Sequence, residues 1–337
     1  MMPENTSKPE AATADSPMRV GVYILAILIA ALGGYLYMLR NQSIMTCPGT
    51  GYGPDSYLAY CQGEQYGDFD HGAFWLDLEP GIRHRAATAD VLFLGNSRMQ
   101  FAFSSDSVDR WFSAAGVSHY LMGFAYWENY TFEWPLIKQI RPQPKVLIVN
   151  LDGFFRPTET PPATTVMHDH DAGGHYARKR LWQIAHREIC SRIPGICGSK
   201  ESFYRSIATG SYTRVGGGTR TIPVTYAATV DGQMLADYTR RGREFFSSLP
   251  VDRRCVLLTM VPANPLPGSD KTTNSGTAKA IASALGLSLI APELPGLTTF
   301  DGSHLDRPSA DKWSQAFLEE ASPQIRECLD NPADRAR

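Results

Sequence analysis

One long apolar segment stands out near the start of the chain. Residues 20–39, VGVYILAILIAALGGYLYML, carry no charge, and twenty helical residues span about 30 Å, the thickness of a bilayer core. The residues before it are polar and rich in Glu, Thr, Ser and Pro. We predict a disordered tail over residues 1–18 and an uncleaved transmembrane anchor over 19–40, because the bulky sequence that follows offers no small-residue cleavage site.

The charges that flank this segment predict its orientation. Lys8 and Arg19 precede it, whereas after Arg40 the next basic residue is Arg83 and several acids come first. Basic residues favour the cytoplasmic side, so the N-terminus is expected in the cytoplasm. We therefore expect a single-pass protein of a bacterial inner membrane, anchored through Val20–Leu39, with the rest of the chain in the periplasm.

Beyond an irregular N-terminal extension over residues 41–88, short apolar runs alternate with amphipathic segments. Apolar runs ended by glycine are typical of strands buried on both faces. The predicted strands are 90–95, 119–124, 145–151, 255–261 and 287–290. The predicted helices are 104–116, 128–140, 232–247, 275–285 and 308–328. This order predicts an α/β domain over 89–328, a three-layer sandwich around a central parallel sheet.

An insertion interrupts this domain at about 153–230. It is rich in Gly, Pro and Thr and contains one basic, helix-like piece, YARKRLWQIAHREIC. We expect it to form a cap or a wall for a substrate.

Composition narrows the class of protein. The 337 residues are 43% hydrophobic and 20% charged with a net charge of -2, so no basic surface argues for a nucleic-acid partner. All six cysteines follow the apolar segment, and an even number suits an oxidising compartment. Pairing of sequence neighbours would give Cys47–Cys61, Cys190–Cys197 and Cys255–Cys328, one of several connectivities. Six buried free thiols are the alternative.

Two motifs carry candidate chemistry. In VLFLGNSRMQ, Ser97 follows a buried strand through Gly-Asn, and in TTFDGSHLDRPSA, Asp301 lies three residues before His304. Reactive groups gather beyond the carboxyl ends of parallel strands, and a serine nucleophile needs a base with an orienting acid. We expect Ser97 as nucleophile, His304 as base and Asp301 as its acid. The alternative is an ordinary strand-to-helix turn in which Ser97 is a helix cap.

With both motifs in these places, the sequence resembles the SGNH (GDSL-like) hydrolase superfamily, in particular membrane-anchored envelope members related to alginate and teichoic-acid acylation proteins. The resemblance covers about residues 88–325 without the insertion and implies a flavodoxin-like SGNH fold. It implies the triad named above and an oxyanion hole formed by the backbone N–H groups of Ser97 and Gly123 together with Asn150. The chain departs from the family pattern twice: Asn96 stands where an Asp is usual, and the third strand ends in VNLDGFF instead of a Gly-x-Asn-Asp block.

Three further sets of residues were considered. Arg98 is a candidate to bind an anionic sugar or acyl group, but pairing with a nearby acid is favoured because a buried arginine needs a carboxylate partner. Trp127, in AYWENY, is a candidate sugar platform, but core or cap packing is the favoured interpretation. The His and Asp side chains of residues 168–175 have metal-ligand chemistry but no helical spacing, so neither a metal nor a cofactor is expected.

These expectations converge on an ester-handling serine enzyme. The resemblance implies an esterase or O-acyltransferase that acts on acyl groups, acetyl above all, of an envelope or secreted polysaccharide, with a membrane-bound acyl-transfer protein as a potential partner. Water or a sugar hydroxyl would resolve the same acyl-enzyme, so the two activities share their catalytic residues. The alternative is a catalytically inactive glycan-binding or assembly protein of a polysaccharide export system.

Overall fold

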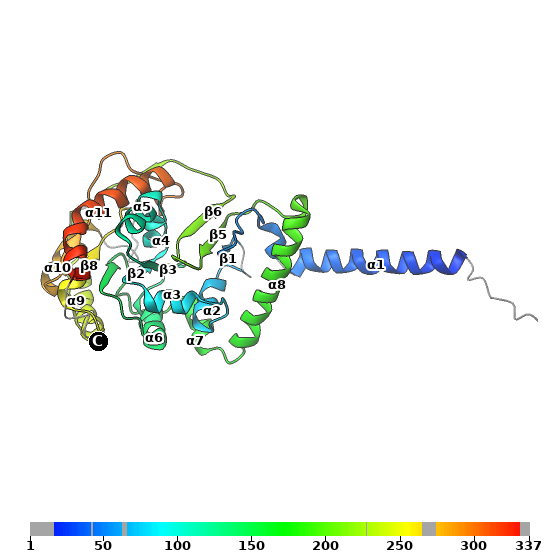
Figure 1. Cartoon of the computed structure of the whole chain (residues 1–337), viewed down its shortest axis with the longest axis horizontal. Helices are drawn as coiled ribbons and strands as arrows, with labels where there is room; N and C mark the ends of the chain where they lie inside the picture. Colours follow the sequence, from blue (N-terminus) through cyan, green and yellow to red (C-terminus); the bar gives the residue numbers. More distant parts are fainter. Residues whose placement is uncertain (1–16, 42, 63–65, 227, 265–273, 331–337) are drawn as a thin grey trace, which may run out of the picture.

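The computed structural model describes residues 17–41, 43–62, 66–226, 228–264 and 274–330 (Figure 1). Its centre is a sheet of five parallel strands. These are β2 (Val91–Asn96), β3 (His119–Phe124), β4 (Val146–Asn150), β8 (Val256–Thr259) and β9 (Ser288–Ile290). They lie in the order β3-β2-β4-β8-β9. The chain enters at β2, adds β3 on one side as an edge strand, and then adds β4, β8 and β9 on the other side. The five predicted central strands are thereby confirmed, with shifts of a residue or two at their ends.

Helices cover both faces of this sheet, since alternate residues of each strand enter different cores. Val91 and Phe93 pack on one side, and Leu92 and Leu94 on the other. The first core contains side chains from α4 (Ser97–Phe103), α5 (Asp106–Ala115) and α11 (Arg307–Asp330). The second contains side chains from α3 (Ile82–Thr88), α6 (Tyr130–Ile140), α9 (Gly232–Ser247) and α10 (Ser275–Leu285). The expected mixed α/β architecture is present, and α4 is a short helix that the sequence pattern did not predict.

A second, antiparallel sheet unites the N-terminal extension with the insertion. Its order is β1 (Ser56–Cys61), β5 (Ser202–Ser206) and β6 (Tyr212–Val215). Around it lie the 3-10 turns η1 (Ser43–Thr46) and η2 (Pro194–Ile196) and the helices α2 (Phe69–Trp75), α7 (Pro161–His168) and α8 (Ala172–Arg192). The extension is thus ordered and not irregular as expected, and α8 corresponds to the basic helix-like piece. The short elements η3 (Arg253–Cys255), β7 (Ile222–Pro223) and β10 (Thr298–Thr299) complete the chain, with β7 paired to β10.

The second sheet covers the free edge of β3. The Arg205 guanidinium on β5 donates to the carbonyl oxygens of Leu121, at 2.7 Å, and Gly123, and the Leu121 N–H donates to Thr209 O at 2.9 Å. Arg205 is fully buried and forms an ion pair with Asp70 at 2.8 Å. Burial of an unpaired charge is costly, so Asp70 is what allows arginine to reach this edge.

Three disulfides and one exposed apolar helix complete the description. The disulfides are Cys47–Cys61, Cys190–Cys197 and Cys255–Cys328, which confirms the pairing of sequence neighbours. The helix α1 (Pro17–Asn41) extends away from the domain (Figure 1). Its segment Val20–Met38 is long and apolar enough to cross a membrane and is not buried by the rest of the chain.

Candidate functional site

Ser97 lies at the junction between the first central strand and α4. Asn96 ends β2 and caps α4, because its side-chain oxygen accepts from the Arg98 N–H at 3.0 Å. Gly95 has a φ of 153°, and a Cβ there would lie 3.0 Å from Asn150 Cβ and 3.2 Å from Met99 Cβ. Only glycine fits this turn without displacing its neighbours. The turn thereby places Ser97, half-buried, at the carboxyl end of the sheet.

The side chains of Ser97, His304 and Asp301 form a continuous hydrogen-bonded chain. Ser97 Oγ lies 2.8 Å from His304 Nε2, and His304 Nδ1 lies 2.7 Å from Asp301 Oδ2. An ionised carboxylate only accepts, so the Nδ1–H donates to Asp301 and Nε2 is left to accept from the Ser97 hydroxyl. The expected nucleophile, base and acid are therefore in the tautomer and arrangement that proton transfer from serine requires.

Asp301 is held ionised by the loop that carries it. Burial of this carboxyl opposes ionisation, but hydrogen bonds from the His304 ring and from the backbone N–H groups of His304 and Ser303 outweigh it and lower the pKa of Asp301 to about 2. The two backbone bonds to Oδ1 measure 2.8 and 2.9 Å. The His304 ring is fixed in addition by stacking on Phe300 and by contact with Phe101.

Arg98 connects the serine turn to the histidine loop. Its Nη1 forms an ion pair with Asp152 at 2.7 Å, and its Nε donates to Ser303 Oγ at 2.9 Å. Asn96 also donates to Asp152, at 2.8 Å to the carbonyl oxygen. Arg98 and Asp152 are buried, at 1% and 0% exposure. The arrangement matches the favoured interpretation of Arg98, pairing with a nearby acid, and it places the arginine beneath the site.

Two expected oxyanion donors have other partners in this structure. The Gly123 N–H donates to Gln100 Oε1 at 3.0 Å, while Gln100 Nε2 donates to Gly210 O. Asn150 is fully buried: its Nδ2 donates to Asn96 Oδ1 at 3.5 Å, and its Oδ1 accepts from the Val261 N–H at 3.1 Å. A role for Gly123 in an oxyanion hole stays a prediction and would require Gln100 to move. The role of Asn150 also stays a prediction.

A cavity of about 370 Å³ opens beside the serine. Its walls come from four parts of the fold: the serine turn, the segment after β3, the loop before α11, and the second sheet. The lining residues are Tyr60, Ser97, Ala125, Tyr126, Trp127, Glu201, Phe203, Asp301, Gly302, Ser303 and His304. Trp127 therefore borders the cavity as expected of a substrate-binding residue, and the insertion supplies part of the wall.

Three of these wall residues, Tyr60, Glu201 and Phe203, have no local sequence signature. Tyr60 and Phe203 stack at 4.8 Å between ring centroids, and Glu201 forms an ion pair with Arg214 at 2.6 Å. Tyr60 lies on β1, Phe203 on β5 and Glu201 just before β5, two strands that are far apart in the sequence and pair in the fold. Tyr126, in contrast, lies within the aromatic motif AYWENY.

The cavity wall contains strained backbone. Tyr126 and Trp127 are adjacent non-glycine residues with φ values of 64° and 53°. Each costs on the order of 1–3 kcal/mol, so surrounding contacts must hold this turn. The next residue, Glu128, is fully buried and accepts hydrogen bonds from His71 at 2.9 Å and Thr160 Oγ1 at 2.5 Å. Backbone strain of this kind gathers at binding and catalytic sites.

The possible metal-ligating groups lie elsewhere. His168 pairs with Glu159 at 3.0 Å, and the His170 side chain is 92% exposed. Among the described residues, the one group with suitable spacing is His186, Cys190 and Cys197, whose two sulfur atoms are joined in a disulfide. With this disulfide formed, neither cysteine can bind a metal ion as a thiolate.

Comparison with known proteins gives no relative: no protein-family model, no curated protein and no solved structure matches this chain.

Proposed function

We propose that this protein is a serine enzyme that transfers or hydrolyses acyl esters, with Ser97 as nucleophile. The observation that carries the proposal is the chain of hydrogen bonds from Ser97 through His304 to Asp301 at the wall of an open cavity. The strand order of the central sheet, which places the reacting serine after its first strand, supports the proposed relation to SGNH hydrolases.

The reaction proceeds in two balanced steps. Ser97 Oγ attacks the acyl carbonyl carbon while its proton passes to His304 Nε2. The tetrahedral intermediate then collapses, the ester C–O bond breaks, and His304 returns the proton to the departing alcohol. In the second step water or a second hydroxyl attacks the acyl-serine carbonyl carbon and gives its proton to His304 Nε2. The bond between the acyl carbon and Ser97 Oγ then breaks, and His304 returns the proton to Oγ. Asp301, ionised throughout, stabilises the imidazolium form of His304.

We infer a carbohydrate ester as the substrate. The walls of the cavity carry the rings of Tyr60, Trp127 and Phe203, on which sugar rings pack, and the cavity volume fits one residue of a polymer with its acyl group. An N-terminal anchor and three disulfides suit a domain on the outer side of an inner membrane, in the periplasm. A polysaccharide exported there, and a membrane-bound protein that delivers the acyl group, are the proposed partners.

A non-catalytic glycan-binding protein is the second candidate. It is favoured by the bond between Gly123 N–H and Gln100, which occupies an expected oxyanion donor. Loss of oxyanion donors lowers the rate of acyl transfer by a factor of about 100 to 1,000 each, while a binding cleft would be unaffected.

Labelling with a fluorophosphonate separates the two candidates. We expect the full chain to be labelled on Ser97, and labelling to disappear in Ser97→Ala and His304→Ala. Ser113→Ala, an exposed serine on α5, is the matched control and should be labelled like the wild type. Turnover of an activated acetyl ester should likewise be lost in Ser97→Ala and His304→Ala and be retained in Ser113→Ala. Equal labelling of wild type and Ser97→Ala would refute catalysis by this serine.

A further inference from the structure

The helix α8 buries three long polar side chains and exposes two large apolar ones. It buries Lys179, Gln183 and His186, with exposures of 6%, 4% and 0%, and exposes Leu181 at 66% and Ile184 at 48%. The buried polar groups all have partners: Lys179 pairs with Asp68, and Gln183 donates to Leu58 O at 2.7 Å. An ordinary surface helix has the opposite arrangement. The outward side of α8 is therefore suited to a surface other than water.

The exposed apolar residues form one face. Ala177, Leu181, Ile184 and Glu188 are spaced by three or four residues, which places them on the same side of a helix, and Ile193 follows at its C-terminal end. Outside α1, the large apolar side chains exposed among the described residues are Tyr126, Leu181, Ile184, Ile193, Tyr226 and Val230. Two of these six, Leu181 and Ile184, lie on this face of α8 three positions apart, and Ile193 follows the last residue of the helix.

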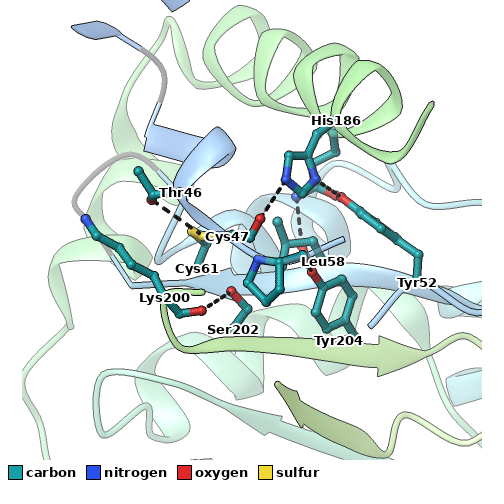
Figure 2. The surroundings of a disulfide bond; sticks show 11 residues. Thr46, Cys47, Tyr52, Leu58, Cys61, His186, Lys200, Ser202 and Tyr204 are labelled. Carbon is teal, nitrogen blue, oxygen red and sulfur yellow. Dashed lines mark hydrogen bonds between the residues drawn. A yellow bond between two sulfur atoms is a disulfide. The ribbon is translucent and has the colours of Figure 1, made fainter. Parts of the chain in front are cut away.

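The helix is fixed close to the end of α1. His186 Nε2 lies 3.0 Å from the carbonyl oxygen of Cys47 and its Nδ1 lies 3.0 Å from Tyr52 Oη (Figure 2). The turn η1 contacts both α1 and α8, and α8 lies across the end of α1 (Figure 1). From Asn41 to Cys47 the chain can extend at most about 20 Å. A membrane crossed by α1 is therefore within reach of α8.

The charges around this face suit an anionic lipid surface. Arg178, Arg187 and Arg192 are exposed on α8, while its one acidic residue, Glu188, pairs with Arg192 at 3.0 Å. Arginine side chains at the rim of an apolar face can pack their stems on it while the guanidinium groups bind lipid phosphates. Each such cation near an anionic bilayer adds on the order of 1 kcal/mol to binding.

We propose that the outward face of α8, defined by Ala177, Leu181 and Ile184 with Arg178 and Arg192 at its rim, docks on the lipid headgroup region beside α1. This inference rests on the proposed spanning of the membrane by α1. A lipid surface is favoured over a protein partner because the anchor holds α8 close to the bilayer. In addition, α8 lies across the direction of the spanning helix α1, as a helix in the membrane interface does. Docking fixes the orientation of the domain, and with it the direction in which the cavity faces.

The test uses the full chain in nanodiscs of phosphatidylglycerol and phosphatidylcholine. All six native cysteines are paired, so a nitroxide attaches selectively to one introduced cysteine. The labelled variants are Leu181→Cys, Leu28→Cys in α1, and Gln315→Cys on α11, on the side of the domain away from α1 (Figure 1). A high collision rate with oxygen reports that the nitroxide contacts lipid, and a high collision rate with a nickel chelate reports that it contacts water. We expect lipid contact at 28 and 181 and water contact at 315.

Each other outcome is decisive. Lipid contact at 28 with water contact at 181 overturns docking and leaves the anchor intact, whereas water contact at 28 refutes the anchor itself. Protection of 181 from both reagents, with dipolar broadening, indicates a second copy of the chain and overturns the lipid assignment.

A second test removes the arginines at the rim. Arg178→Gln/Arg192→Gln should lose the dependence of lipid contact at 181 on phosphatidylglycerol, while Arg240→Gln/Arg243→Gln on α9, also exposed, should retain it. Equal effects of the two double variants contradict the proposal.

Discussion

The Arg98 guanidinium donates to the Ser303 hydroxyl at 2.9 Å although the two residues are 205 positions apart. Arg98 follows the proposed nucleophile directly, and Ser303 directly precedes the proposed base. One buried side chain therefore sets the distance between the serine turn and the histidine loop, and its charge is balanced by Asp152.

Ser303→Ala removes this connection without touching the Ser97–His304–Asp301 chain. A hydrogen bond from a charged donor contributes about 1.5–3 kcal/mol, and part of this is expressed in the transition state. We therefore expect kcat for an activated ester to fall by roughly 2- to 10-fold with little change in KM. Ser303→Thr keeps the hydroxyl and should restore kcat, a rescue that loss of stability alone would not produce. Unchanged kcat in Ser303→Ala would show that the connection has no positioning role.

Asp301 gives a prediction for stability against pH. Its pKa is lowered to about 2 in the folded chain, against about 3.9 for an unfolded aspartate. A lowered folded-state pKa stabilises above the unfolded value, and this contribution is lost as pH falls through the folded one. The difference in unfolding free energy between wild type and Asp301→Asn should be constant above about pH 5 and shrink toward pH 2. Urea unfolding at a series of pH values measures it, and a difference that grows on acidification would contradict the assignment.

The Asp70–Arg205 pair should be far more sensitive than its neighbours. Asp70→Asn leaves a fully buried guanidinium without its counter-charge, which costs on the order of 3–5 kcal/mol. Tyr57→Phe removes a single hydrogen bond to the same carboxylate and serves as the matched control, at about 1.5–3 kcal/mol because the acceptor is charged. Chemical unfolding of both variants tests the order, and a smaller loss in Asp70→Asn would show that the pair is dispensable.

The disulfides should differ in their contribution to stability. Cys255–Cys328 closes a separation of 73 residues and Cys190–Cys197 one of 7. Loop-closure entropy assigns them about 4 and about 2 kcal/mol respectively. Paired Cys→Ala variants of each, compared by chemical unfolding, should show this order. The reverse order would mean that native contacts near Cys190 outweigh the entropy of the unfolded chain.

The central sheet could be predicted because its strands are locally distinctive. Val91–Leu94 and Val146–Val149 are unbroken apolar runs, as burial on both faces requires. The second sheet could not, since SYLAYC, SFYRS and YTRV are short and mixed in polarity. Strand β1 pairs with a strand more than a hundred residues away, and no pattern within either segment records that partner.

The candidate site, too, could be predicted from the sequence only in part. The approach of Ser97, Asp301 and His304 was expected, because Asp301 and His304 are close in sequence and both ends of the arrangement lie at the carboxyl edge of the sheet. Gln100 was missed, since a glutamine one turn after the serine has no signature until its contact with the Gly123 N–H is known. The catalytic roles themselves remain predictions for the labelling experiment.

The cover over β3 has a consequence for how the chain is made. The unpaired edge of a sheet is a template for association with other chains, and β3 is protected by contacts with Arg205 and Thr209. Synthesis delivers residues 119–124 well before residues 205–209, so a growing or truncated chain presents this edge bare. During folding, association through β3 therefore competes with formation of the second sheet until residues 205–209 reach this edge.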